Sequence, residues 1–115
     1  MALEIWHNPR CSKSRQTLAL VRDQGLEPTV IEYLKTPPNA ERLEQVLAML
    51  ELTPRQLMRR KEADYKDQGI DDDSLSDDQL IAAMIEFPKL IERPVVINGG
   101  QAALGRPPEQ VLEIL

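Results

Sequence analysis

The first third of the chain alternates apolar and polar runs whose lengths predict a βαβ unit. Leu3–His7 is short, with its apolar segment at Leu3–Trp6, and Asn8-Pro9 ends it, which is typical of a buried strand. Apolar residues then recur at helical spacing from Cys11, and Gly25 is expected to end that helix. Thr29–Leu34 is rich in β-branched and aromatic residues and predicts a second strand. Two strands joined by a helix within about 30 residues predict a parallel, right-handed crossover.

The middle of the chain, at about 39–90, is predicted to be helical. Apolar residues from Leu43 to Leu50 recur at helical spacing. Thr53–Gln56 and Ser76–Gln79 both have the pattern of a capping box, and the first of them has Pro54 at the first helical position. The helix that begins after Thr53 is expected to end at Arg59 and Arg60.

The last part of the chain predicts a hairpin followed by a helix. Val95–Ile97 is a predicted strand, Asn98–Gly100 a turn, and Ala102–Leu104 the return strand, before a helix that begins at Pro107-Pro108. The order βαβ, helical insert, ββα predicts an α/β protein of the thioredoxin-like fold with a four-stranded mixed sheet. We expect a single domain over residues 1–115, with the insert at about 39–90.

Composition narrows the class of protein. The 115 residues are 42% hydrophobic and 29% charged, which is typical of a globular chain, and the net charge of −5 argues against nucleic acid as a partner. One cysteine cannot form an internal disulfide, and no leader pattern or apolar run of membrane length occurs. We therefore expect a soluble cytoplasmic monomer without a membrane partner.

Cys11 is the candidate nucleophile, because it lies where the first strand turns into the first helix. The free N–H groups at a helix N-terminus, together with nearby cations, favour a thiolate. His7 precedes Cys11 by four residues and either holds a proton near the sulfur or is a strand-end histidine with one hydrogen bond. Ser14 follows by one helical turn and either donates to the sulfur or is simply a small helix residue.

The residues around Cys11 exclude two familiar thiol sites. A dithiol site of the thioredoxin type needs a second cysteine where the chain has Ser14, and a tyrosine-phosphatase loop needs an arginine where it has Thr17. Chemistry at Cys11 therefore needs a thiol from another molecule to complete it.

Three arginines are candidates for binding an anionic substrate, although each alone could be a solvated charge: Arg59, Arg93 and Arg106. Guanidinium groups bind tetrahedral oxyanions in a bidentate manner. The acidic stretch Asp71–Asp73 lacks the glycine and distal glutamate of a calcium loop, so no metal site is expected.

Six segments along the chain form an ordered set of motifs: His7-Asn8-Pro9-x-Cys11-x-x-Ser14-Arg15, Tyr33-Leu34 with Pro37-Pro38, Leu57-Met58-Arg59, Asp78-Gln79-Leu80-Ile81, Ile91-Glu92-Arg93-Pro94 and Gly105-Arg106-Pro107. With these segments the chain resembles, over essentially its whole length, the glutaredoxin-coupled arsenate reductases, and its Arg10–Ser14 run resembles a compact chromosomal branch of that family. The first motif is moderately specific, and the ordered combination is highly specific.

The resemblance implies roles for individual residues. Cys11 would be the nucleophile, with His7 helping to activate it and Ser14 beside it in the same motif. Arg59, Arg93 and Arg106 would bind the oxyanion, and Pro94 would follow a cis peptide bond. No bound cofactor is implied: glutathione is the co-substrate and glutaredoxin the protein partner in reducing arsenate to arsenite.

Two other functions are open at this point. One is a glutathione-dependent thiol oxidoreductase that acts on another substrate, such as a different oxyanion. The other is a redox-responsive transcriptional regulator of the same fold that binds RNA polymerase. Such regulators usually carry a Cys-x-x-Cys switch, so Ser14 argues against this second alternative.

Overall fold

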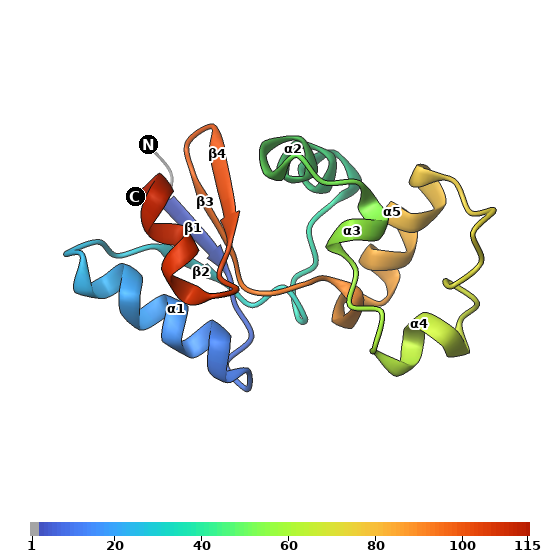
Figure 1. Ribbon diagram of the computed structural model, residues 1–115, viewed down its shortest axis with the longest axis horizontal. Helices are drawn as coiled ribbons and strands as arrows, with labels where there is room; N and C mark the ends of the chain where they lie inside the picture. The colour runs from blue at the N-terminus through green and yellow to red at the C-terminus, as the bar shows by residue number, and fades with distance from the viewer. Residues whose placement is uncertain (1–2) are drawn as a thin grey trace. The chain divides into compact units, whose positions relative to one another are not determined.

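The computed structural model describes residues 3–115 and divides the chain into two compact units. The first unit holds the chain up to Thr36 together with Arg93–Leu115, and the second holds Pro37–Glu92 (Figure 1). The second unit takes in the segment at about 39–90 that we expected to be a helical insert. That the two units form one domain stays a prediction.

The first unit is built on the expected four-stranded mixed sheet. Its strands are β1 (Leu3–Trp6), β2 (Thr29–Ile31), β3 (Val95–Asn98) and β4 (Gln101–Leu104), in the order β2-β1-β3-β4. β1 pairs in parallel with β2 and antiparallel with β3, which pairs antiparallel with β4. The predicted βαβ crossover and C-terminal hairpin are thus confirmed.

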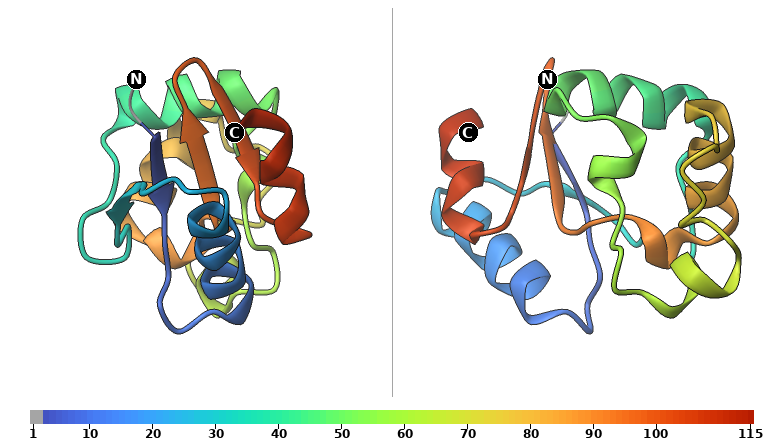
Figure 2. Two further views of the ribbon diagram at one scale, coloured as in Figure 1. Left: turned by 90° about the vertical axis from the view of Figure 1, so that its left-hand side faces the viewer. Right: turned by 45° about the vertical axis from the view of Figure 1, so that its right-hand side comes forward.

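Two helices lie beside each other on one face of this sheet: α1 (Ser12–Asp23) and η2 (Pro108–Ile114), as Figures 1 and 2 show. Between the helices and the strands lies a core of four fully buried residues: Ile5, Val21, Val96 and Val111. This core holds α1 against the central strands. The strand-to-helix turn that carries Cys11 is therefore anchored at both ends.

Some boundaries of these elements differ from the expected ones. β2 ends at Ile31 rather than Leu34, because Lys35 N–H donates to the Glu32 carbonyl oxygen and turns the chain. The last helix is a 3-10 helix, in which hydrogen bonds span three residues, as from Gln110 N–H to Pro107 O.

The second unit is helical, as predicted. Its elements are α2 (Ala40–Leu50), α3 (Pro54–Leu57), α4 (Ala63–Asp67), α5 (Asp77–Glu86) and η1 (Pro88–Leu90). Both capping boxes form, with Thr53 and Ser76 each accepting a backbone hydrogen bond from the glutamine three residues later. Within residues 3–115, no helix combines the length and apolar character needed to cross a membrane.

The expectation that Arg59 and Arg60 end a helix is wrong. α3 ends at Leu57, and Met58 is extended and pairs with Ile91 in an antiparallel bridge. Arg59 N–H donates to Leu90 O at 2.7 Å. Met58 and Ile91 are both buried, so the extended pairing places two apolar side chains in the core of this unit.

Candidate active site

Cys11 is the N-cap residue of α1 and is partly exposed, so the thiol is accessible to a reactant. Its backbone is extended, with φ −94° and ψ 124°, and its side chain makes no capping hydrogen bond of the usual kind. The backbone N–H groups of Ser14 and Lys13, which lie in the first turn of the helix and have no partner within it, favour the charged form of the sulfur. This is the position that the sequence predicted for the thiol.

Several effects act on the pKa of the Cys11 thiol. Partial burial is the largest and raises it, but the Ser14 N–H, the Arg93 charge, the Lys13 N–H and a hydrogen bond from Arg93 together lower it. The net result is a pKa below the ordinary value of a thiol. A lowered pKa provides more of the nucleophilic thiolate at neutral pH.

Arg93 and Arg106 come from the two ends of the β3–β4 hairpin and meet at Cys11. Arg106 Nη2 donates to Cys11 Sγ at 3.9 Å, and Arg106 Nε donates to the Arg93 carbonyl oxygen at 2.9 Å. The Arg93–Pro94 and Arg106–Pro107 peptide bonds are both cis. Two guanidinium groups beside one thiolate can bind the oxygens of an anion that reacts at the sulfur.

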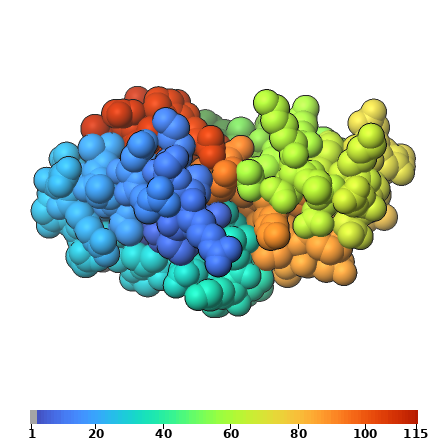
Figure 3. All heavy atoms as spheres, turned by 90° about the horizontal axis from the view of Figure 1, so that it is seen from below, coloured from blue at the N-terminus to red at the C-terminus, as the bar shows by residue number. Residues whose placement is uncertain are grey.

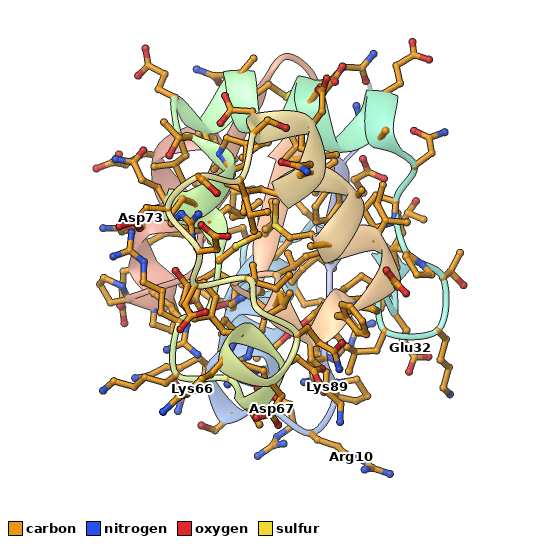
Figure 4. All side chains as sticks on the ribbon, turned by 90° about the vertical axis from the view of Figure 1, so that its right-hand side faces the viewer. Arg10, Glu32, Lys66, Asp67, Asp73 and Lys89 are labelled. Atoms are coloured by element: carbon orange, nitrogen blue, oxygen red, sulfur yellow. The ribbon has the colours of Figure 1, made fainter. Side chains whose placement is uncertain are left out.

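The loop before Cys11 is held by its own hydrogen bonds. Asn8 Oδ1 accepts from Arg10 N–H at 3.0 Å, and Asn8 O accepts from Cys11 N–H at 3.0 Å. Arg15 Nη1 donates to Pro9 O at 2.9 Å. Arg10 itself points outward from the loop (Figure 4). The pattern Asn8-Pro9 predicted the end of the strand but not these bonds, although asparagine before proline is a known turn signal.

His7 and Ser14 form a buried pair behind this loop. Ser14 Oγ lies 2.6 Å from His7 Nδ1 and accepts Asn8 N–H at 3.0 Å. The Ser14 hydroxyl therefore bonds His7, and it is the backbone N–H of Ser14 that lowers the pKa of the Cys11 thiol. Burial lowers the pKa of His7, the Glu32 carboxylate raises it, and the Arg22 and Arg15 charges lower it further, with a net decrease. His7 also lines a cavity of about 200 Å³ together with Arg10 and Glu32.

Arg59, the third candidate for anion binding, belongs to the second unit. It is half-buried and forms an ion pair with Glu62 at 3.1 Å. The structure thus brings together Cys11, Arg93 and Arg106 within the first unit. Most side chains of α1, which follows Cys11, are exposed on the surface of that unit (Figure 3).

The acidic stretch forms turns and a helix start. Within the part of the chain that the structure describes, no group of three or more His, Cys, Asp or Glu residues could hold a metal ion. Asp72 Oδ1 accepts from both Ser74 N–H and Ser74 Oγ, and these hydrogen bonds lower the pKa of Asp72. Asp77 and Asp78 lie in the first turn of α5, where negative charge stabilises a helix.

Comparison with known proteins shows the family. The model of the ArsC family matches residues 6–114, nearly the whole chain. The chain belongs to the ArsC family. It is 48% identical over 115 residues to "Arsenate reductase" of Rhizobium meliloti (strain 1021), covering 100% of this chain and 82% of that protein. This confirms the resemblance seen in the sequence.

Two further relatives match this chain over nearly their full lengths. "Uncharacterized protein YfgD" of Escherichia coli (strain K12) is 53% identical over 114 residues, covering 98% of this chain and 96% of that one. The solved structure "Arsenate reductase from Vibrio cholerae" is 57% identical, with a TM-score of 0.96, and covers 100% of this chain and 98% of that chain. The thioredoxin-like α/β fold is therefore shared.

Proposed function

We propose that this protein is an arsenate reductase in which Cys11 is the nucleophile. The observation that carries the proposal is the Cys11 thiol at the start of α1, with a lowered pKa and with Arg106 Nη2 3.9 Å from its sulfur. Full-length similarity to proteins named arsenate reductase supports arsenate as the substrate.

The first step is attack of the Cys11 thiolate on arsenic(V). A sulfur–arsenic bond forms and one arsenate oxygen leaves as water after protonation, so no electrons have yet moved to arsenic. Arg93 and Arg106 bind the remaining oxygens and spread their negative charge. We propose the same role for Arg59, as the resemblance implies.

The second step needs an outside thiol, because Cys11 is the only cysteine of the chain. Glutathione attacks the Cys11 sulfur, the sulfur–arsenic bond breaks, and its electron pair stays on arsenic, which leaves as arsenite. Cys11 is then joined to glutathione by a disulfide. A glutaredoxin thiolate takes over the glutathione and releases the Cys11 thiolate for another cycle.

His7 and Ser14 are proposed to support this chemistry from behind the loop. Through Asn8 N–H, their hydrogen-bonded pair fixes the backbone that leads to Cys11. The reaction consumes reduced glutathione, which the cytosol keeps available, so we propose that the protein acts in the cytoplasm.

A coupled assay tests the proposal. Purified protein is mixed with arsenate, glutathione, glutaredoxin and glutathione reductase, and NADPH oxidation is followed. We expect an arsenate-dependent rate that Cys11→Ser abolishes without unfolding the protein, because a serine hydroxyl is a poor nucleophile at neutral pH. Activity retained in Cys11→Ser would show that the mechanism is wrong.

The same assay separates the alternative functions. If no arsenate-dependent rate is seen but Cys11 is readily glutathionylated and then reduced by glutaredoxin, the protein is a thiol oxidoreductase for another substrate. Arsenate is then excluded while the role of Cys11 is kept. The YfgD relative, whose printed name states no substrate, makes this alternative worth testing directly.

A further inference from the structure

Gly105 lies at a point where the chain has no room for a side chain. A methyl group on this residue would lie 2.4 Å from Thr17 Oγ1, 2.6 Å from Pro94 Cγ and 3.0 Å from Thr17 Cγ2. The first two distances are too short for any real contact. Gly105 does not have a positive φ, so glycine is needed here for space and not for backbone conformation. By contrast, Gly100 has nothing within 4 Å of the same position.

Neither neighbour of Gly105 can easily move away. Thr17 is fully buried in α1, and its Oγ1 donates to Lys13 O at 2.8 Å, which fixes the side chain. Pro94 is buried and rigid, and its carbonyl oxygen accepts from Gly105 N–H at 2.9 Å. The helix, the Pro94 turn and the end of β4 therefore meet at one tightly packed point.

The packing point at Gly105 adjoins the two arginines that act on the Cys11 sulfur. Gly105 directly precedes Arg106, whose Nη2 lies 3.9 Å from Cys11 Sγ. Pro94 directly follows Arg93, whose carbonyl oxygen accepts from Arg106 Nε. Thr17 is on the helix that Cys11 caps. A shift at Gly105 would therefore move both arginines relative to the sulfur.

We propose that Gly105 and Thr17 are positioning residues that set the distance of Arg93 and Arg106 from Cys11 Sγ. They touch neither the sulfur nor the anion in this scheme. They act by allowing β4 to approach α1 closely enough for both guanidinium groups to reach the thiolate. The part that concerns the anion rests on the proposed function, whereas the part that concerns the thiolate does not.

The test is Gly105→Ala, with two readouts. The first is the pH dependence of Cys11 alkylation by iodoacetamide, which reports the pKa of the thiol and needs no arsenate. We expect its midpoint to rise, because the arginines move away from the sulfur. The second is steady-state kinetics with arsenate, where we expect KM to rise about tenfold or more, since small displacements of charged binding groups have effects of that size.

Rescue distinguishes positioning from a general loss of stability. Thr17→Ala removes the contacts at 2.4 Å and 3.0 Å and leaves the Pro94 contact at 2.6 Å, so adding it to Gly105→Ala should move both readouts part of the way back toward wild type. Gly100→Ala is the matched control and should change neither readout. The proposal is overturned for Gly105 if folded Gly105→Ala has the wild-type midpoint and KM, and it is overturned for Thr17 if Thr17→Ala restores nothing.

If Gly105→Ala does not fold, a second pair of variants tests the same proposal. Thr17→Val replaces Oγ1 with a bulkier methyl group and presses on Gly105 from the helix side. Thr17→Ala loses the same hydroxyl without adding bulk. A higher alkylation midpoint in the valine variant than in the alanine variant supports the proposal, and equal midpoints overturn it.

The same measurements distinguish failure of the proposed function from failure of the positioning proposal. If wild-type protein does not reduce arsenate, the assignment of substrate is wrong, but the alkylation midpoints of these variants still decide whether Gly105 and Thr17 position the arginines. If arsenate is reduced and the midpoints do not move, the positioning proposal alone fails.

Discussion

The Ser14 hydroxyl oxygen lies 2.6 Å from His7 Nδ1, and this buried bond joins the histidine to the loop before Cys11. Asn8 N–H donates to the same oxygen at 3.0 Å. A hydroxyl carries one donor and two acceptor lone pairs, so Ser14 can serve both partners at once. The lowered pKa of His7, caused first by burial, favours the neutral ring.

Loss of the Ser14 hydroxyl should destabilise the protein. Ser14→Ala leaves both the Asn8 N–H and His7 Nδ1 without this partner in a buried place. We expect the free energy of unfolding to fall by about 1–3 kcal/mol, the usual effect of an unsatisfied buried polar group. Urea unfolding measures it. Ser12→Ala, at the exposed start of α1, is the control, and equal losses in the two variants would contradict this account.

His7 should also make stability depend on pH. Its folded pKa is lowered, mainly by burial, so the unfolded chain binds the proton more readily than the folded one. The contribution of neutral His7 is therefore fully present above the unfolded pKa of about 6.5 and is lost as the pH falls through the folded value.

Urea unfolding across this pH range, with His7→Gln as the reference, checks the prediction. His7 is the only histidine of the chain, so subtracting the variant curve isolates its titration from that of the carboxylates. We expect wild type to lose stability relative to His7→Gln as the pH falls below about 6.5. A difference that grows in the opposite direction would show that folding raises the pKa of His7.

Arg93 should set the reactivity of the Cys11 thiol. Burial raises the pKa of Cys11, and the Arg93 charge and hydrogen bond are among the effects that bring it down. Arg93→Ala should raise the midpoint of the alkylation rate against pH, so alkylation at neutral pH becomes slower. Arg10→Ala removes an equal charge from a side chain that points outward, and it should leave the midpoint unchanged (Figure 4). Equal midpoints in all three proteins would exclude this role for Arg93.

Local patterns in the sequence predicted most of the fold. The apolar run Leu3–Trp6 and the β-rich Thr29–Ile31 form strands that pair in parallel, and a turn at Gly99-Gly100, within the predicted Asn98–Gly100, joins the C-terminal hairpin. Both capping boxes form, because each depends on residues only three positions apart. Such features need no knowledge of distant contacts. The end of α3 does need it, because Met58 leaves the helix to pair with Ile91 far along the chain.

The candidate site was predictable only in part, for the same reason. The place of Cys11 at a helix N-terminus follows from the local pattern, and the structure has it there. The hydrogen bond between the Ser14 hydroxyl and His7 does not follow from the local pattern. The hydroxyl could bond either the Cys11 sulfur or His7, and only the folded structure shows which of the two lies within hydrogen-bond distance. The contact of Gly105 with Thr17 joins β4 to α1 across most of the chain and leaves no local signal beyond the glycine itself.

In the second unit, Arg55 should hold the segment that follows α4. Its Nη1 donates to Tyr65 Oη at 2.7 Å and Ile70 O at 2.6 Å, and its Nη2 donates to Asp72 O at 2.9 Å. One guanidinium thus satisfies three acceptors from a stretch with little core of its own. Arg55→Ala should lower the free energy of unfolding by about 1–3 kcal/mol and speed amide exchange at Ile70.

The control for Arg55 is Arg60→Ala, which removes an exposed arginine from the same unit. It should leave both the unfolding free energy and the exchange rate close to wild type, because exposed charges contribute little to stability. The Cys11 alkylation midpoint should be the same in all three proteins, since the bonds from Arg55 to Tyr65, Ile70 and Asp72 lie within the second unit. Slow, wild-type exchange at Ile70 in Arg55→Ala would show that other contacts hold this segment.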